Sequence, residues 1–500
     1  ADKLIDVLRA DGGADSRPSE ASCEAYVARG RGLSALRRHA EASDAYGLAA
    51  TRCEGLPRQV YALFLGGRSA LRGGQPAVAR LRYAELERRF PKHRFADDAR
   101  LHGARAVARL GDAAVFTRML STIADDYPDG DMLEDGLFAL ALARIKEGNW
   151  AAAVGPLERA VALSRPASYY ARGRAAYFLA RARLALGLKR QGLAGLERVI
   201  RDHPLSYYMA LAYSRLAHFD EARARAILQK ASAREPRGEF VIADHPSLRS
   251  LPFRRAVALA RQGDAKRALG ELRPLLDRGA PPPLLWASAF VLAQSEAPAE
   301  SHGVLRAAPG EWTRHYPAGV WRRIWEIAYP RPYAKIVERE RARSPIPEHL
   351  AYAIMREESA FRPEAVSPAR AYGLMQLIMP TARSMGRKLG MKVTRKTLHD
   401  PAVNIALGSR FLSILSKRFS YNPLLAIPGY NAGPGAPRRW VKKRAVDDFD
   451  VFVETIPYRE TRRYTKRVIR TMAAYATLYG KGMDGAWLRL PEHVAPPQGS

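Results

Sequence analysis

Between Ala21 and Tyr329 the chain consists almost entirely of helix-forming residues, and its apolar residues recur at spacings of three and four. This spacing places apolar side chains along one face of a helix and predicts a succession of amphipathic helices. Short breaks at Gly, Pro and Asp separate the helical stretches, and we find no convincing alternation of strand residues among them. The pattern therefore restricts this part of the chain to an all-α fold.

The breaks recur at a constant interval. Gly74, Gly111 and Gly148 lie 37 residues apart, and the pairs Phe90-Pro91 and Tyr127-Pro128 repeat with the same interval. A glycine can end one helix in a left-handed conformation, and a proline half a repeat later can start or separate the next helix. A period of 37 is close to that of tetratricopeptide-like helix pairs, which stack because one pair cannot bury its apolar face alone. The sequence therefore predicts a tetratricopeptide-like α-superhelix.

The formal net charge of +31 comes mostly from arginine and is spread along the whole chain. Such a distribution favours an anionic partner that binds over a wide surface. That partner could be nucleic acid, acidic lipid or an acidic polymer such as a cell wall, although a compositional bias would explain the distribution equally well.

No stretch approaches the ~18 to 20 apolar residues of a membrane-spanning helix, so we expect no transmembrane segment. The chain begins at Ala1 without an apolar signal core, so we expect a removed secretion signal or a trimmed N-terminus.

Cys23 and Cys53 are the only cysteines, too few for a cysteine-built metal site. Each lies in a helical stretch, and a separation of 30 residues suits the opposite arms of a helical hairpin. A disulfide between them is expected if the compartment is oxidising, and it would stabilise the fold by about 3 to 4 kcal/mol. Two reduced thiols in a core are the alternative.

The residue types needed for acid catalysis occur in a helix that we expect over residues 348–361. At 100° per residue, Glu358 projects between the directions of Ile354 and Met355, so its carboxylate is aimed at apolar surroundings. Burial without a cationic partner would keep Glu358 protonated to a higher pH, which is what a general acid near neutrality requires. Glu357 lies on the other flank of the apolar face. Geometry alone prefers Glu358 only modestly, because a single glutamate on an amphipathic helix is usually a surface residue.

Five short motifs follow this helix in order between residues 359 and 464: Ser359-Ala360-Phe361, Ser367-Pro368, Ala371-Tyr372-Gly373-Leu374-Met375-Gln376-Leu377, Tyr430-Asn431-Ala432-Gly433-Pro434-Gly435 and Ile456-Pro457-Tyr458-Arg459-Glu460-Thr461-Arg462-Arg463-Tyr464. In order and spacing they resemble the soluble lytic transglycosylases. The resemblance is close over the part from about Pro345 to Gly480 and looser over the helical N-terminal region.

The resemblance implies a goose-lysozyme-like α-helical catalytic domain docked on an α-superhelix. We expect four parts: an N-terminal segment at 1–20, the superhelical domain at 21–335 with a linker-like part from about 203, the lysozyme-like domain at 336–485, and a tail at 486–500. The aromatic-rich stretch that begins the linker-like part departs from the repeat and suggests a packing joint. The family cuts the β-1,4 bond between N-acetylmuramic acid and N-acetylglucosamine of peptidoglycan, and it leaves a 1,6-anhydro-muramoyl end without using water.

The resemblance also implies site residues, with Glu358 as the acid and then the base. The expected substrate-binding residues are Ser359, Ser367, Gly373, Met375, Gln376, Tyr430, Asn431, Glu460 and Tyr464. Gly373 would let backbone approach the sugar, and Gln376 offers a donor and an acceptor. Tyr430 would stack on a sugar face and donate its hydroxyl. Turn chemistry for the glycines and Asn431, and core packing for Met375 and Tyr464, are the structural alternatives.

Three departures from the family pattern bear on the site. Pro428 and Gly429 stand where two small residues usually precede the Tyr-Asn-Ala-Gly motif, so the helix there is expected to be interrupted. Arg370 replaces a customary glycine and puts the shape of its loop in question. A methionine often found two places after the glutamine is absent, so its contact either comes from Met379 or is lost.

Ordinary glycosidases use a second carboxylate across the bond, and we find no second acidic residue that is an obvious candidate for that role.

The histidines do not cluster with acids at metal spacing, and no glycine-rich phosphate loop precedes a helix, so we expect no cofactor and no metal. The expected partners are peptidoglycan glycan strands, with cell-wall proteins possible through the superhelix, and the expected location is the periplasm.

Other functions stay open from the sequence. An inactive, basic scaffold that binds peptidoglycan through the repeats is one alternative, and a hydrolytic lysozyme in which water attacks is the nearest enzymatic rival. Nucleic-acid binding is disfavoured because zinc-finger spacing, an aromatic RNA-binding motif and a concentrated basic recognition helix are all missing from the sequence.

Overall fold

The computed structural model describes residues 19–163, 171–277, 279–295, 297–308, 310–346, 349–443, 448–480 and 489–494. Most of the expected N-terminal segment and tail, and the expected start of the helix at residue 348, therefore lie outside the described residues. The chain divides into two compact units, at residues 1–165 and 166–500. This division differs from the expected boundary near residue 336, and the limits of the lysozyme-like domain within the second unit stay a prediction.

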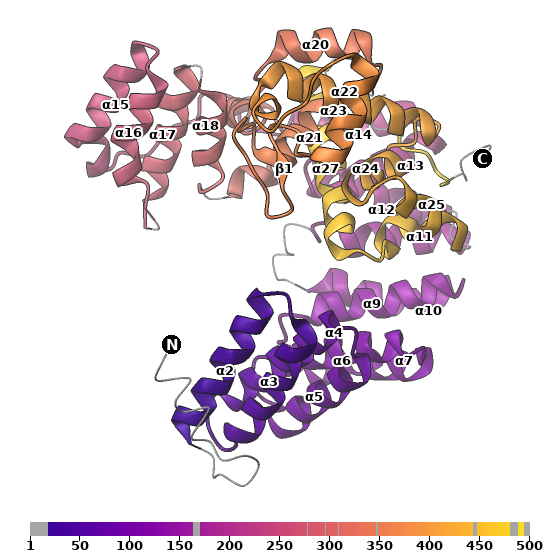
Figure 1. Cartoon of the computed structure of the whole chain (residues 1–500). Coiled ribbons are helices and arrows are strands. Elements are labelled where there is room, and N and C mark those ends of the chain that lie inside the picture. The colour runs from indigo at the N-terminus through magenta and orange to yellow at the C-terminus, as the bar shows by residue number, and fades with distance from the viewer. Residues whose placement is uncertain are drawn as a thin grey trace. The chain divides into compact units, whose positions relative to one another are not determined.

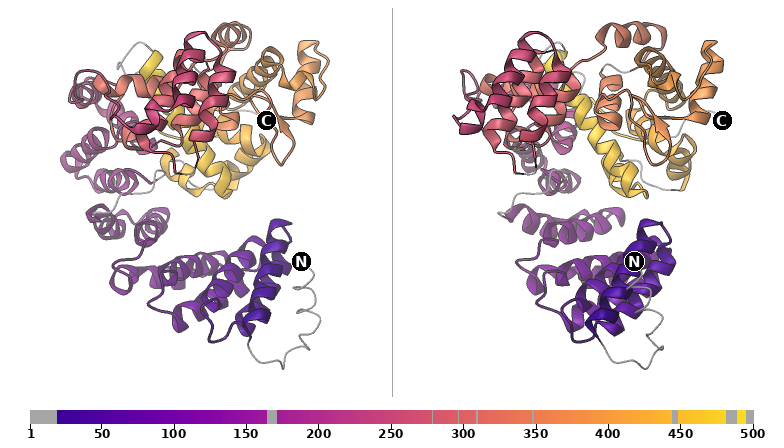
Figure 2. Two further views of the ribbon diagram at one scale, coloured as in Figure 1. Left: turned by 90° about the vertical axis from the view of Figure 1, so that its left-hand side faces the viewer. Right: turned by 60° about the vertical axis from the view of Figure 1, so that its left-hand side comes forward.

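The first unit is a series of helices that pack as sequential neighbours (Figure 1). They are α2 (Glu20–Ala35), α3 (His39–Arg52), α4 (Gln59–Arg72), α5 (Pro76–Arg89), α6 (Ala96–Arg109), α7 (Ala113–Ser121), α8 (Ile123–Asp126), α9 (Leu133–Lys146) and α10 (Trp150–Ala162). Figure 2 gives two further views of these paired helices.

The 37-residue repeat of the sequence is the repeat of this unit. Helices α4, α6 and α9 begin at Gln59, Ala96 and Leu133. The glycine just after each of them has a positive φ, of 77° at Gly74, 90° at Gly111 and 76° at Gly148. Only glycine adopts that conformation at little cost, so the repeat of glycines fixes the repeat of helix ends. The prediction of an all-α fold of stacked helix pairs is confirmed.

A disulfide joins Cys23 of α2 to Cys53 at the end of α3, so the pairing that the sequence left open is present. Both sulfur-bearing side chains are fully buried, in one cluster with Tyr46, Leu63 and Tyr83. The bridge therefore ties the first helix pair together inside its own apolar core.

The second unit is also helical, with one small hairpin. Its elements are α11 (Arg174–Ala185), α12 (Lys189–Asp202), α13 (Tyr207–Phe219), α14 (Glu221–Ser232), η1 (Pro246–Arg249), α15 (Leu251–Arg261), α16 (Ala265–Leu272), η2 (Arg273–Leu275), α17 (Pro282–Gln294), α18 (Pro298–Leu305), η3 (Gly310–Arg314), η4 (Gly319–Trp321), α19 (Arg322–Ala328), α20 (Ala334–Arg343), α21 (Leu350–Ser359), β1 (Ala371–Tyr372), β2 (Leu377–Ile378), α22 (Met379–Leu389), η5 (Thr397–His399), α23 (Pro401–Arg418), α24 (Pro423–Ala432), α25 (Gly435–Lys443), α26 (Phe449–Thr455) and α27 (Arg459–Tyr479). None of the described helices is long and apolar enough to cross a membrane.

Helix α13 joins the earlier helices of this unit to its C-terminal part. Almost every residue of α13 is buried, and the helix packs against α27. The hydroxyl of Tyr208 donates to Oε1 of Glu454 at 2.7 Å, and Lys466 Nζ donates to the Tyr208 hydroxyl at 2.8 Å. The aromatic-rich segment that suggested a packing joint therefore lies at such a joint.

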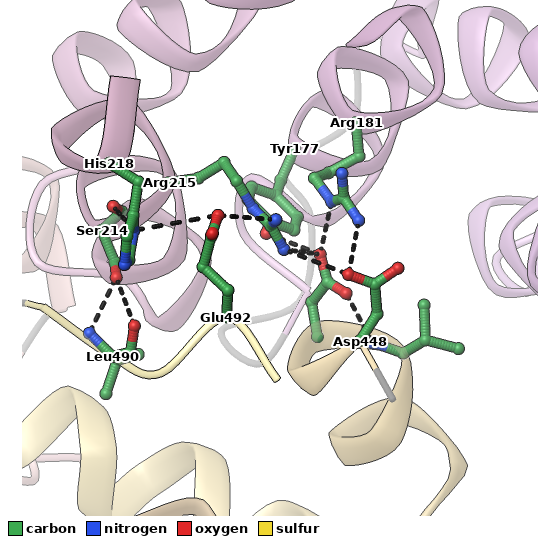
Figure 3. A network of polar contacts seen from close by, with 10 residues as sticks. Tyr177, Arg181, Ser214, Arg215, His218, Asp448, Leu490 and Glu492 are labelled. Carbon is green, nitrogen blue, oxygen red and sulfur yellow. Dashed lines mark hydrogen bonds and ion pairs between the residues drawn. The ribbon is translucent and has the colours of Figure 1, made fainter. Parts of the chain in front are cut away.

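A second set of polar contacts connects α11 and α13 to the start of α26 (Figure 3). Arg181 and Arg215 point toward Asp448 and Asp450, and Arg181 Nε lies 2.7 Å from an Asp450 carboxylate oxygen. Tyr177 donates its hydroxyl to the same carboxylate at 2.7 Å. These contacts fix the C-terminal helices of the unit against its earlier helices.

The hairpin was missed by the sequence analysis. Strands β1 and β2 are antiparallel and only two residues long each, with Ala371 opposite Ile378 and Tyr372 opposite Leu377. Two residues are too few to show the alternation by which strands are recognised. The turn of this hairpin is formed by the sequence Gly-Leu-Met-Gln at residues 373–376, which contains three of the expected substrate-binding residues.

Candidate active site

Helix α21 carries the two adjacent glutamates, and it is shorter than expected. It ends at Ser359, because Ala360 and Phe361 have positive φ values of 51° and 63°. Phe361 therefore does not belong to the helix, although its side chain is fully buried. Ile354 and Met355 are also fully buried, so the apolar face that the sequence predicted for this helix is present.

Glu357 is held by ion pairs. Arg356 Nη1 lies 2.8 Å from its Oε1, and Arg467 Nε of α27 lies 2.9 Å from its Oε2. The Thr471 hydroxyl of α27 donates to Oε1 at 2.8 Å. Two guanidinium groups and a hydroxyl therefore hold the Glu357 carboxylate, and its contacts with Arg467 and Thr471 join α21 to α27.

Glu358 has a different environment one residue later. It is partly buried, and among the described residues it makes no ion pair. Burial raises the pKa of Glu358 to about 7, with smaller increases from Glu357 and Glu460, while Tyr464 and Arg467 lower it. A carboxyl group with a pKa near 7 can give up and take back a proton at neutral pH.

Two tyrosines flank the Glu358 carboxyl. Tyr464 of α27 is buried beside it, near enough to lower its pKa, but its hydroxyl does not meet hydrogen-bond geometry with any described protein group. Tyr430 of α24 is 9% exposed, and its hydroxyl donates to the carbonyl of Met375 at 2.7 Å. The charge of Glu358 raises the pKa of both phenols after burial does so, and both therefore stay protonated donors.

The hairpin turn is packed beneath these residues. Ser359 is buried and donates its hydroxyl to the carbonyls of Met355 and Leu374, at 3.1 and 2.8 Å. Met375 is fully buried, and its amide donates to Oδ1 of Asn404 at 2.8 Å. The Ser359 side chain thus joins α21 to the hairpin, and the Met375 backbone amide joins the hairpin to α23; the expected contacts of both residues with substrate stay predictions.

Gly373 and Gln376 have structural contacts as well. Gly373 has a φ of 76°, and a Cβ atom there would overlap the Leu398 carbonyl and the Asn404 side chain. The neighbouring protein atoms and the positive φ require glycine at this position, in agreement with the structural alternative of turn chemistry, and the expected approach of its backbone to the sugar stays a prediction. Gln376 donates both of its amide hydrogen bonds within the loop, to the carbonyls of Ala365 and Gly373 at 3.0 and 2.9 Å.

Asn404 of α23 is the residue of this region that the sequence analysis missed. It is fully buried, accepts from Met375 N, and donates to the carbonyls of Tyr372 and Leu398 at 3.0 and 2.8 Å. It thereby satisfies backbone groups on both sides of the hairpin turn. No sequence motif marks Asn404 within its helix. Only the prediction that its position on the helix is buried could have pointed to it.

The remaining expected residues lie nearer the surface. Asn431 is exposed, and its Oδ1 accepts from the Thr461 hydroxyl at 2.6 Å, which ties the end of α24 to the start of α27. Glu460 is exposed in the first turn of α27 and is close enough to raise the pKa of Glu358. Ser367 closes its own turn, because its Oγ accepts from the Ala371 amide at 3.0 Å.

The departures from the family pattern leave the local backbone intact. Helix α24 continues through Pro428 and ends at Ala432, so the expected interruption is wrong. Gly429 lets the helix approach Phe419, where a Cβ atom would lie 3.0 Å from the ring. Arg370 takes the positive φ of 56° that glycine would adopt, and its amide donates to the Ser367 carbonyl at 2.8 Å. Met379 begins α22 and is partly buried.

Residues 335–453 match the family described as the transglycosylase SLT domain. The soluble lytic murein transglycosylase of Escherichia coli K12 is 34% identical over 175 residues, which cover 34% of this chain and 27% of that protein. The soluble lytic murein transglycosylase of Salmonella typhimurium is 32% identical over 216 residues, covering 41% and 33%. The matched region thus spans a third or less of these relatives' own length.

Two solved structures resemble this chain over nearly its whole length. The inactive mutant of the lytic transglycosylase Slt from Pseudomonas aeruginosa has a TM-score of 0.63 at 22% identity, covering 98% of this chain and 77% of that one. The 70 kDa soluble lytic transglycosylase of Escherichia coli has a TM-score of 0.59 at 21% identity, with the same coverage. At these identities the likeness establishes the fold.

Proposed function

Since residues 335–453 of this chain belong to the transglycosylase SLT domain family, we propose that the protein is a lytic transglycosylase with Glu358 as its catalytic residue. The substrate is peptidoglycan, and the bond cleaved is the β-1,4 bond from N-acetylmuramic acid to N-acetylglucosamine. The observation that carries the proposal is the environment of Glu358, whose pKa is raised to about 7 by burial and which has no ion-pair partner among the described residues.

The reaction needs one group that is first an acid and then a base. Glu358 gives its proton to the glycosidic oxygen as the bond from that oxygen to C1 of the muramoyl ring breaks. The ring passes through an oxocarbenium-like state. The ionised Glu358 then takes the proton of the ring's own C6 hydroxyl as its oxygen bonds to C1, so the product is a 1,6-anhydro sugar and no water is consumed.

The neighbours of Glu358 suit a site with a single working carboxylate. Ordinary glycosidases use a second carboxylate across the bond. Glu357 is engaged by Arg356 and Arg467, and Glu460 is exposed, so neither matches that role. The buried Tyr464 hydroxyl lies where it would stabilise the Glu358 carboxylate after proton transfer.

The proposal extends to location and partners. A protein that cleaves peptidoglycan works where that polymer lies, so we place it in the periplasm. Its stacked helix pairs would offer a surface for cell-wall proteins, as such arrays generally do.

Mass spectrometry of the soluble products of purified sacculi tests this function. We expect anhydro-muropeptides from the wild-type protein and a loss of rate on the order of 10³-fold in Glu358→Gln, because the acid is removed while the shape is kept. Glu338→Gln makes the same change at an exposed position of α20 and should release products at the wild-type rate.

Each other outcome contradicts a definite part of the proposal. Products with reducing ends, heavier by one water, would mean a hydrolase. No products from the wild-type protein would favour a scaffold that only binds peptidoglycan. Normal products from Glu358→Gln would show that another group is the acid.

A further inference from the structure

A cavity of about 710 Å³ lies on the side of α21 that carries Glu357. Its walls come from parts of the second unit that are far apart in the sequence: the turn before α11, the end of α18, η3, α21 and α27. Six arginines line it, namely Arg172, Arg306, Arg314, Arg356, Arg467 and Arg470. Glu311 and Glu357 are its two acidic residues, so the lining has a formal excess of four positive charges.

Much of that positive charge is not neutralised by protein carboxylates. Glu357 is already engaged by Arg356 and Arg467. Among the described residues, Arg306 and Arg314 form no ion pair, and Arg172 donates only to the carbonyl and hydroxyl of Thr313, at 2.6 and 3.1 Å. Like charges gathered in a concave wall focus a positive potential that attracts anions.

The protein bears a cost for this arrangement. Burial lowers the pKa of Arg172, and the nearby charge of Arg314 lowers it further. Burial also lowers the pKa of Arg470, whose Nε donates to the Leu205 carbonyl at 3.1 Å. A bound anion would offset the repulsion and so stabilise the folded state, by an amount that grows with the logarithm of the anion concentration once this exceeds Kd.

We propose that this cavity binds the carboxylates of peptidoglycan peptide stems at a site separate from Glu358. This inference rests on the proposed function, since the stems are the acidic part of that substrate. Guanidinium groups bind carboxylates through two parallel hydrogen bonds, and several of them around one cavity suit a ligand with more than one carboxylate. The volume is in the range of sites for molecules the size of a short peptide.

The two sites lie on different sides of one helix. Glu357 lines the cavity and Glu358 does not. Adjacent side chains on a helix point about 100° apart. Arg467 connects the sites, because it pairs with Glu357 and also lowers the pKa of Glu358. A carboxylate bound at Arg467 would weaken that influence, so occupancy should raise the pKa of Glu358.

Calorimetric titration of the full chain with free peptide stem, which has no glycosidic bond, tests the site. Arg306→Gln combined with Arg314→Gln removes two charges at exposed positions, and we expect at least tenfold weaker binding. Arg254→Gln combined with Arg255→Gln, on the exposed face of α15, is the matched control and should bind as wild type. Stem with amidated carboxylates should bind at least tenfold more weakly than free stem.

Several results would overturn the inference. These are no binding of free stem, equal binding of amidated stem, or an equal loss of affinity in the α15 control. Inorganic phosphate that binds as tightly as the stem would make this a general anion site. A wild-type protein that releases anhydro-muropeptides and fails to bind stem refutes this inference alone, whereas one that binds stem and releases nothing refutes the proposed function.

Discussion

Two buried carboxyl groups of the second unit, Asp450 and Glu358, respond to burial in opposite ways. Asp450 is fully buried, and its carboxylate pairs with Arg181 and Arg215. Burial alone would raise its pKa, but Arg181, Arg215 and the Tyr177 hydroxyl outweigh burial and lower it. Glu358 is less deeply buried and has no such partners among the described residues, and its pKa is raised to about 7.

The comparison shows that the free-energy cost of burying a charge does not by itself decide whether a carboxyl group is ionised. Burial penalises any charge, and it is the partners that decide whether the carboxyl group stays ionised. Asp450 has two arginines from other helices and serves to join parts of the fold. Tyr464 and Arg467 lower the pKa of Glu358 by less than burial raises it, so its proton remains available for exchange near neutral pH.

The largest effect that would sharpen this contrast is expected from Asp450→Asn. The change removes one of the two carboxylates that the buried Arg181 and Arg215 share and leaves them Asp448, so we expect a cost at the low end of that for breaking a buried pair, about 3 kcal/mol. Urea unfolding followed by tryptophan fluorescence measures it, because six of the seven tryptophans lie after residue 165.

Glu492→Gln is the control for that experiment. Glu492 pairs with Arg215 at 3.1 Å but is 33% exposed, so its loss should cost less than about 1 kcal/mol. A change below 1 kcal/mol in Asp450→Asn as well would show that the arginines do not depend on this carboxylate, and the comparison would fail.

Glu358→Gln should do the reverse and stabilise the protein above neutral pH. A group whose pKa is raised in the folded state contributes stability below its unfolded pKa, near 4.5, and loses it as the pH rises through about 7. At pH 8 the ionised Glu358 therefore weakens the fold, and we expect the variant to be more stable by about 1 to 3 kcal/mol.

Unfolding curves of both proteins at pH 4 and pH 8 measure this difference. The two proteins should be nearly equal at pH 4, below the unfolded pKa, where Glu358 is protonated in both states and resembles glutamine. An advantage for the variant that is the same at both pH values would mean that burial does not disfavour the charge of Glu358.

The fold was predictable from the sequence wherever its cause is local. The glycines of the 37-residue repeat end helices through their own backbone conformation, so Gly74, Gly111 and Gly148 indicated where α4, α6 and α9 end. The β1–β2 hairpin was not predictable, because two-residue strands have no pattern of their own.

The candidate site was predictable in part. The order of the motifs selected Glu358, but helix geometry barely distinguished it from Glu357. The distinction comes from Arg467 and Thr471, which are 110 and 114 residues away from Glu357 and bind it in the fold. Ser359 and Gly373, which are expected to touch sugar, also contact protein groups, and no spacing in the sequence reveals those contacts.

The smallest expected effect concerns the environment of Glu358 itself. Tyr464 lowers the pKa of Glu358, so Tyr464→Phe should raise that pKa. The proposed acid must be protonated to act, and kcat/KM should fall as the pH rises through the pKa of Glu358, near 7 in the wild-type protein. The variant's falling limb should therefore lie at higher pH.

Initial rates on solubilised glycan strands between pH 5 and 9 would locate this limb. Tyr430→Phe is the matched control, because the Tyr430 hydroxyl donates to the Met375 carbonyl and is not among the groups that lower the pKa of Glu358. Loss of the Tyr430 hydroxyl should reduce the rate, because the hairpin loses a contact that positions it. The falling limb of the pH profile should stay at its wild-type pH. A limb that moves equally in both variants would mean that the phenols act on Glu358 only by filling space, and one that moves in neither would remove Tyr464 from the account of why Glu358 and Asp450 differ.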